Sequence, residues 1–88
     1  MKKAYQVILK TNASKDLDDI PVDILPKMNK VFLEMAKDPR PPGVKKLDGP
    51  VYRIRVGQWR IIYSIFDKNG EVVIFRIRRR NEKTYKTL

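Results

Sequence analysis

The sequence contains no cysteine and no histidine. The first absence excludes disulfide bonds, thiolate nucleophiles and cysteine-based zinc sites, and the second removes the usual imidazole acid and base. Long apolar runs are also missing, because the N-terminal Met1-Lys2-Lys3-Ala4-Tyr5 leads directly into an alternating segment. This start predicts neither a secretory signal nor a membrane span. We therefore expect a soluble cytoplasmic protein whose chemistry uses other side chains.

Acidic residues are scarce, with 10 Asp and Glu against 20 Lys and Arg, so the formal net charge is +10. A chain of 88 residues forms one domain, and we expect residues 1–88 to fold as a single unit. A charge this high favours polyanionic partners: nucleic acid, ribosome, an acidic protein or an anionic membrane. Residues 45–88 carry 12 basic and 4 acidic groups, and no segment has the pattern of a basic amphipathic membrane helix.

The pattern of apolar residues predicts an α+β fold. Residues 4–10 are rich in β-branched and aromatic side chains and predict a first strand, and Asn12 or Ser14 could cap a short helix over residues 15–20. Helical spacing from residue 24 to residue 35 predicts a longer helix, with Asp23 as its N-cap and Lys37 near its end. Three strands follow, so we expect two helices of the N-terminal half packed on a twisted antiparallel sheet.

The clearest signal is a hairpin formed by residues 51–56 and 59–65, which alternate apolar and polar side chains around Gly57-Gln58. If Val56 pairs with Trp59, then Arg55 faces Arg60 and Arg53 lies on the same side. Like charges opposed in a sheet are destabilising, since each cross-strand pair contributes only about 0.2 to 1 kcal/mol even when favourable. The face therefore either binds an anion or remains a solvated, positively charged surface.

Strand alternation also predicts which residues face the helices. The core face should carry the apolar and aromatic residues of the hairpin, including its tryptophan: Tyr52, Ile54, Val56, Trp59, Ile61, Tyr63 and Ile65. A tight turn at Lys68-Asn69-Gly70-Glu71 then leads into a third strand, from Val72 to about Arg78. Continued alternation puts Ile62, Phe66, Val73, Phe75 and Ile77 on the arginine side, an apolar area that a partner or the chain's own tail should cover.

The C-terminal segment combines a triple arginine, residues 78–80, with Tyr85. Aromatic side chains beside basic groups can stack on exposed bases of single-stranded nucleic acid. Alternatively, Tyr85 pins the tail to the core. The sequence leaves both alternatives open.

Three motifs occur in order along the chain: residues 38–47 (DPRPPGVKKL), residues 52–63 (YRIRVGQWRIIY), and residues 72–77 (VVIFRI) followed by a basic group and a late tyrosine. Together they resemble the RelE/ParE toxin superfamily of bacterial and archaeal toxin–antitoxin modules, particularly its RelE branch. The resemblance spans nearly the whole chain. It implies a RelE-like fold and a ribosome-dependent endoribonuclease in which the ribose 2′-hydroxyl attacks the scissile phosphate and leaves a cyclic phosphate. It also implies that no metal or cofactor is needed.

The resemblance also assigns roles to particular residues. The catalytic positions fall on Arg53, Arg55, Arg60, Arg80 (or its neighbour Arg79) and Tyr85, and further contacts to RNA are expected from Lys45, Lys46, Arg78, Arg79 and Lys83. The positions in the first hairpin strand often hold lysine in the family and are both arginine here. Since arginine does not readily give up a proton, the general base stays open, and stabilisation of the phosphorane is the expected role of the arginines. Tyr85 could stack on a base, or act as the base if the arginines lower its pKa.

Two other functions remain compatible with the sequence. One is inhibition of DNA gyrase, as in the ParE branch on the same fold, and the other is a catalytically impaired module that binds RNA or antitoxin. The expected partners are an acidic or amphipathic antitoxin, the ribosome and mRNA, because the chain is strongly basic and exposes apolar surface.

Overall fold

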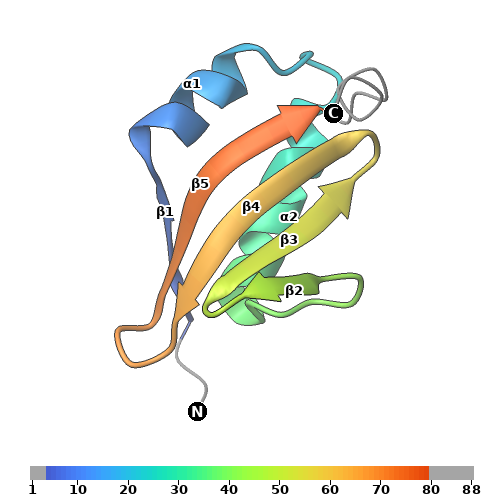
Figure 1. Cartoon of the computed structure of the whole chain (residues 1–88). Helices are drawn as coiled ribbons and strands as arrows, with labels where there is room; N and C mark the ends of the chain where they lie inside the picture. Colours follow the sequence, from blue (N-terminus) through green and yellow to red (C-terminus); the bar gives the residue numbers. More distant parts are fainter. Residues whose placement is uncertain (1–3, 80–88) are drawn as a thin grey trace.

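Figure 1 shows the computed structural model, which describes residues 4–79. Within this range one sheet contains β1 (Gln6–Leu9), β2 (Lys45–Asp48), β3 (Val51–Val56), β4 (Trp59–Phe66) and β5 (Glu71–Arg79), in the order β1-β5-β4-β3-β2. Two helices, α1 (Thr11–Asp18) and α2 (Leu25–Lys37), lie between β1 and β2 in the chain. Neighbouring strands are antiparallel except β1 and β5, which are parallel. The predicted α+β fold is confirmed.

Two features of the sheet differ from the prediction. Residues Lys45–Asp48 form the edge strand β2 rather than a loop, although all four are exposed and show no apolar alternation; they are held by backbone pairing with β3. The first strand is parallel to the last one, with Gln6 beside Glu71 and Leu9 beside Ile74. No local turn signal could specify this pairing, because the two strands come from opposite ends of the described chain.

Helix starts and one turn were also predicted inaccurately. Helix α1 begins at Thr11, immediately after β1, and the Ser14 N–H donates to the Lys10 carbonyl, so Asn12 and Ser14 lie inside the helix. Asp23 does not cap α2, because a turn over residues 22–24 precedes the helix and Ile24 is its N-cap. The β4–β5 turn spans residues 67–70, so Glu71 already belongs to β5 and pairs with Phe66.

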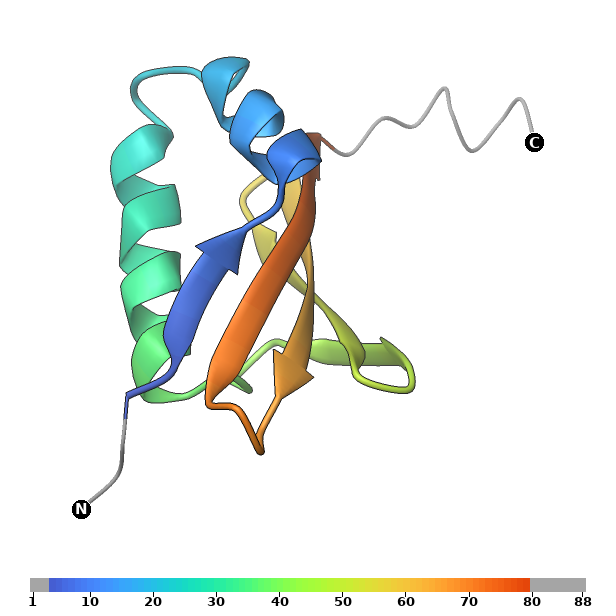
Figure 2. The same ribbon diagram turned by 90° about the vertical axis from the view of Figure 1, so that its left-hand side faces the viewer.

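The core lies between α2 and one face of the sheet, where Met28 and Met35 of α2 are fully buried. Figure 1 views the sheet from the opposite face, with α2 behind it, and Figure 2 shows α2 to one side of the strands. The predicted core face of the hairpin is confirmed: Tyr52, Ile54, Val56, Ile61, Tyr63 and Ile65 are buried, and Trp59 is partly buried against them. Packing against the helix therefore fixes which side of β3 and β4 remains open.

A β-bulge at Phe75 changes the alternation along β5. Tyr63 pairs with Ile74 while its neighbour Ile62 pairs with Arg76, so Phe75 is an extra residue on β5. Beyond it, Ile77 pairs with Ile61 and is buried with only 1% of its surface exposed. The prediction that Ile77 lies on the arginine side is wrong for this reason, and Val73 is also buried, so the apolar area on that side is smaller than expected.

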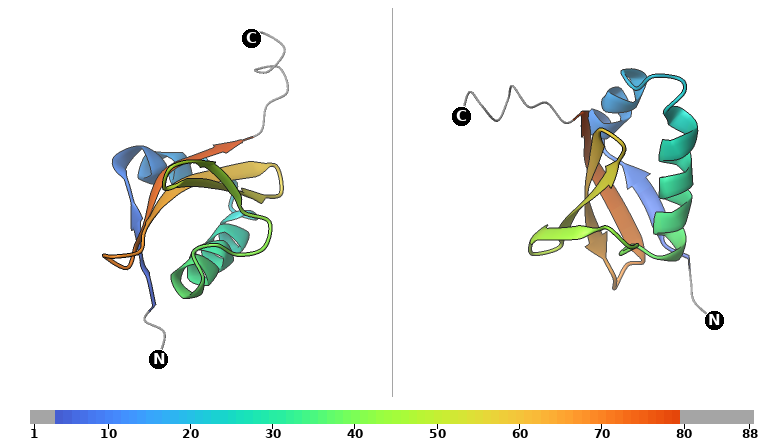
Figure 3. Two further views of the ribbon diagram at one scale, coloured as in Figure 1. Left: turned by 60° about the horizontal axis from the view of Figure 1, so that its bottom comes forward. Right: turned by 90° about the vertical axis from the view of Figure 1, so that its right-hand side faces the viewer.

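The sheet is strongly twisted, and its two ends are finished differently. At one end, β2 and the turn that follows it project away from α2 (Figures 2 and 3). At the other end, β1 pairs with β5 only as far as Ile74, and α1 packs along β5 beyond that point. The face opposite α2 is thus bordered by β2 on one side and by α1 on the other.

Below the core, Tyr63 joins the sheet to the segment that leaves α2. Its hydroxyl donates a 2.8 Å hydrogen bond to the carbonyl of Pro39, and both residues are buried. Burial raises the pKa of the Tyr63 hydroxyl to about 12. Next to it, Arg40 bonds the hydroxyl of Tyr52 and pairs with Asp67, which also accepts a hydrogen bond from Tyr5. These contacts tie the α2–β2 loop to the β4–β5 turn.

We expect Tyr63→Phe to lower the free energy of unfolding by about 1 to 2 kcal/mol near neutral pH, because the Pro39 carbonyl loses its buried donor. The raised pKa means that unfolded Tyr63 releases its proton from pH 10 upward while the folded residue keeps it. Wild-type stability from this group is therefore complete below pH 10 and declines as the pH rises toward 12. In urea unfolding, the difference in the free energy of unfolding between wild type and Tyr63→Phe should decrease from pH 10 to pH 12. A difference that stays constant would contradict the raised pKa of Tyr63.

Candidate nucleic-acid interface

The face of the β3–β4 hairpin opposite α2 carries three arginines. The predicted register is confirmed: Val56 pairs with Trp59, Arg55 with Arg60, and Arg53 with Ile62. Because the residues that alternate with them are buried against α2, these three arginines lie on the opposite face. Arg55 is exposed, whereas Arg53 and Arg60 are half-buried and the Nε atom of Arg60 is buried.

The bulge at Phe75 brings two further arginines from β5 to this face. Arg78 pairs with Arg60, and Arg76 pairs with Ile62. From the other border, Lys45 of β2 pairs with Arg53. The result is a basic surface that crosses four strands and that we call the arginine face: Lys45, Arg53, Arg55, Arg60, Arg76 and Arg78.

Two rows run across the arginine face. One row is Arg55, Arg60 and Arg78, on β3, β4 and β5; the other is Lys45, Arg53, Ile62 and Arg76, on β2 to β5. Since neighbouring strands lie about 4.8 Å apart, the three backbone positions of the first row fall within about 10 Å. Such closely spaced like charges repel one another and favour a bound anion.

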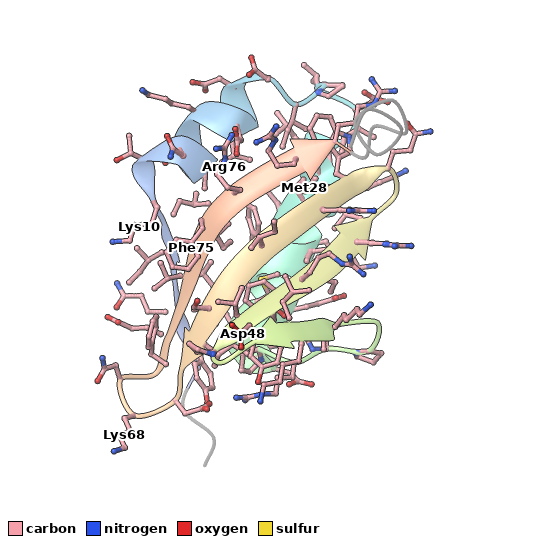
Figure 4. The ribbon with its side chains drawn as sticks, viewed as in Figure 1. Lys10, Met28, Asp48, Lys68, Phe75 and Arg76 are labelled. Atoms are coloured by element: carbon pink, nitrogen blue, oxygen red, sulfur yellow. The ribbon has the colours of Figure 1, made fainter. Side chains whose placement is uncertain are left out.

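Arg76 of the arginine face forms an ion pair with an acidic side chain of α1. Its guanidinium bonds both carboxylate oxygens of Asp16 on α1, at 2.9 Å from Nε and 3.2 Å from Nη2. Figure 4 shows the Arg76 side chain directed toward α1. Burial alone would raise the pKa of Asp16, but hydrogen bonds from Arg76 and the Ile77 N–H, with the charges of Arg76 and Arg78, hold it below its usual value.

Other predicted residues lie elsewhere. Lys46 pairs with Tyr52, and Arg79 pairs with Trp59, so the register places both on the side of α2. Arg79 donates a 3.1 Å hydrogen bond to the side-chain oxygen of Gln58 at the hairpin turn. The predictions for Arg80, Lys83 and Tyr85 fall outside the described residues.

The sequence did not predict Arg76 as a residue of the arginine face. It predicted Arg78 as an RNA contact but did not predict that Arg78 lies beside Arg60. Residues 72–75 (VVIF) are all apolar, so the sequence does not show which of their side chains face the core and which face away from it. The one available signal is the Arg-Ile-Arg pattern of residues 76–78, which repeats the pattern of residues 53–55. A buried isoleucine between two outward arginines, as in β3, predicts the observed arrangement.

The chemistry available on the arginine face is the binding of negative charge. Guanidinium groups are planar, bind phosphate oxygens in pairs and do not act as proton acceptors. The sheet fixes their backbone positions, so the face can stabilise charge that develops on a phosphate without rearranging. Within residues 4–79 no group of three or more acidic side chains could hold a metal ion, and no helix there is long and apolar enough to cross a membrane.

An open cavity of about 670 Å³ lies at a different place, beside the β4–β5 turn. It is lined in part by Tyr5, Lys37, Arg40 and Asp67. Arg40 and Asp67 form a 2.9 Å ion pair there, which lowers the pKa of Asp67 to about 2, because Arg40 and Tyr5 both donate hydrogen bonds to its carboxylate. The Arg40 guanidinium is thus engaged by Asp67, and the cavity also contains the cations Lys37 and Lys68 beside the carboxylate of Asp38.

A family profile described as "ParE toxin of type II toxin-antitoxin system, parDE" matches residues 7–84. The chain belongs to the RelE/ParE family of toxins. The family predicted from the three motifs is thereby confirmed. RelE1 of Methanocaldococcus jannaschii is 31% identical to this RelE/ParE toxin over 87 residues, which cover 93% of this chain and 96% of RelE1.

Solved structures of RelE/ParE proteins share the fold. The toxin–antitoxin complex RelBE2 of Mycobacterium tuberculosis contains a chain with a TM-score of 0.79 and 27% identity, covering 91% of this chain and 95% of that chain. A chain of the archaeal RelE–RelB complex from Pyrococcus horikoshii has a TM-score of 0.83 and 26% identity, and the match covers 90% of this chain and 98% of that chain. Isolated RelE of E. coli has a TM-score of 0.79 at 19% identity, which is a likeness of fold.

Proposed function

We propose that this RelE/ParE toxin is an endoribonuclease that cleaves mRNA on the ribosome. The observation that carries the proposal is the row formed by Arg55, Arg60 and Arg78, three cations on a rigid sheet at the spacing of neighbouring strands. Such a row suits a polyanion whose phosphates must be held in place during reaction. Similarity to RelE1 of Methanocaldococcus jannaschii and to chains of the RelBE2 and RelE–RelB complexes supports the RelE branch, for which the motifs of the sequence imply this activity.

In the proposed reaction, the 2′-hydroxyl oxygen of one ribose loses its proton and attacks the adjacent phosphorus, and the bond from phosphorus to the 5′-oxygen of the next nucleotide breaks. The products are a 2′,3′-cyclic phosphate and a 5′-hydroxyl, whose oxygen takes a proton from water. The phosphorane that forms carries two negative charges, and we propose that Arg60, which lies between Arg55 and Arg78, stabilises them. The arginines do not accept the proton of the 2′-hydroxyl. Tyr85 is the proposed candidate for that step, or for stacking on a neighbouring base, and the ribosome is proposed to orient the mRNA.

Inhibition of DNA gyrase is the second candidate, since the matching profile is that of a ParE toxin. A face that only docks on a protein does not need three arginines in one row at the spacing of strands, and this favours the nuclease. The proposed protein partner is an acidic or amphipathic antitoxin, because relatives were crystallised as RelBE2 and RelE–RelB complexes. Exposed Leu33 on α2, with 67% of its surface accessible, and the charge of +10 support an amphipathic, acidic partner.

The test adds purified, antitoxin-free protein to a translating extract and maps mRNA ends by primer extension. We expect new ends within codons of the translated message, no cleavage of the same RNA without ribosomes, and normal supercoiling by gyrase. A parallel translating reaction without the added protein is the control. Intact mRNA together with blocked supercoiling would reject the nuclease in favour of the gyrase inhibitor.

A further inference from the structure

Asp16 supports the part of β5 whose outer edge, opposite β4, is not paired with β1. Strand β1 ends beside Ile74, and from Phe75 onward α1 lies along that edge of β5 (Figures 1 and 2). There the carboxylate of Asp16 takes the place of a strand, because its Oδ2 accepts a 2.9 Å hydrogen bond from the backbone N–H of Ile77. The edge amide is thereby satisfied by a side chain.

The same carboxylate also holds the side chain of the preceding residue. Arg76 donates to Oδ2 and Oδ1 of Asp16, and the Asp16 side chain is only 15% exposed. Asp16 therefore binds the two residues that come directly before Arg78, one through its backbone and the other through its guanidinium. Hydrogen bonds to an ionised group are the stronger kind.

These contacts belong to the bulged register of β5. They require the Ile77 N–H to point toward α1 while its side chain enters the core, and this holds only when Phe75 is the extra residue. In that register Arg78 lies beside Arg60 on the arginine face. Without the bulge, alternation would turn Arg78 toward α2 and Ile77 outward.

We propose that Asp16 is a positioning residue, which places Arg78 beside Arg60 by fixing the register of β5. The inference rests on the proposed cleavage of mRNA. Asp16 does not touch the RNA; it acts on the reaction through Arg78. Simple electrostatics gives the opposite expectation, because removing an acidic side chain from a basic protein raises its attraction for RNA.

The test compares Asp16→Ala with Asp18→Ala, which removes the same charge from an exposed position at the end of the same helix. We expect Asp16→Ala to slow mRNA cleavage in the extract by about tenfold, with no loss of affinity for a short single-stranded RNA in fluorescence anisotropy. Asp18→Ala should leave the cleavage rate unchanged. In an Arg78→Ala background, Asp16→Ala should cause no further slowing.

An equal slowing in both backgrounds would overturn the inference, since it would show that Asp16 does not act through Arg78. If circular dichroism shows that Asp16→Ala is unfolded, Asp16→Asn replaces it in the double-mutant cycle with Arg78→Ala. It keeps an oxygen for the Ile77 N–H, and we expect a smaller slowing that is again absent with Arg78→Ala.

NMR tests the register of β5 directly, without relying on mRNA cleavage. Cross-strand NOEs between Arg60 and Arg78 should be present in wild type and weakened in Asp16→Ala. If wild type cleaves no mRNA, the proposed function fails. Independently of that result, NOEs between Arg60 and Arg78 that persist unchanged in folded Asp16→Ala would overturn the positioning role.

Discussion

Replacing Arg60 with alanine is expected to slow mRNA cleavage by about 100-fold or more, the loss typical for removing one preorganised donor from a developing negative charge. Arg60 stands at the middle of its row, between Arg55 and Arg78, on a strand paired along both edges. Removing it opens a gap in the row that neither neighbour can close without leaving its own strand. Primer extension on message from a translating extract measures the effect, and inducible expression should show loss of growth arrest.

Lys68→Ala is the matched control for Arg60→Ala, since it removes one positive charge from the exposed β4–β5 turn. We expect its cleavage rate to stay within about twofold of wild type if the loss of overall charge contributes little. Circular dichroism and urea unfolding of Arg60→Ala check that the variant is folded, so that its cleavage rate reports on the site. A folded Arg60→Ala protein that cleaves mRNA at the wild-type rate would remove Arg60 from the site.

The second large effect concerns stability and tests the bulge directly. Ile77→Arg should prevent folding, because it puts an unpaired charge at a position that is 1% exposed, and the cost of several kcal/mol rivals the whole stability of a small domain, about 5 to 15 kcal/mol. The neighbouring change Arg78→Ile should be tolerated within about 0.5 kcal/mol, since Arg78 is exposed. Circular dichroism and urea unfolding measure both.

Strict alternation through β5 predicts the reverse outcome for this pair. It places residue 77 on the open face and residue 78 against α2, so that Ile77→Arg would be harmless and Arg78 would be the sensitive position. A stable Ile77→Arg protein would therefore contradict the bulge. Arg78→Ile also removes one cation from the row and should reduce cleavage without reducing stability, which separates the two roles of β5.

The central hairpin was predictable because its signals are local. Gly57-Gln58 sets the turn, and alternation on both sides sets the register, so the pairing of Arg55 with Arg60 follows from neighbouring residues alone. The apolar spacing of residues 24 to 35 is local in the same sense and predicted the helix α2, whose Met28 and Met35 are fully buried. The family motifs then gave those arginines an expected role.

The remaining features depend on contacts between distant parts of the chain. The bulge at Phe75 is stabilised where β5 leaves β1 and meets Asp16, and a continuous apolar run contains no sign of it. Strand β2 lacks apolar alternation and exists through its pairing with β3. The ion pair of Arg76 with Asp16 joins residues 60 positions apart in the sequence, so no local pattern indicates it.

The place of β5 in the sheet has a consequence for synthesis. It follows every other described element in the chain, yet it lies between β1 and β4. Pairing between early and late segments gives a high contact order and forms late in folding. A nascent chain whose β5 is still inside the exit tunnel has no Arg78 beside Arg60 and no strand to join β1 to β4, so the arginine face is completed only after most of the chain has emerged.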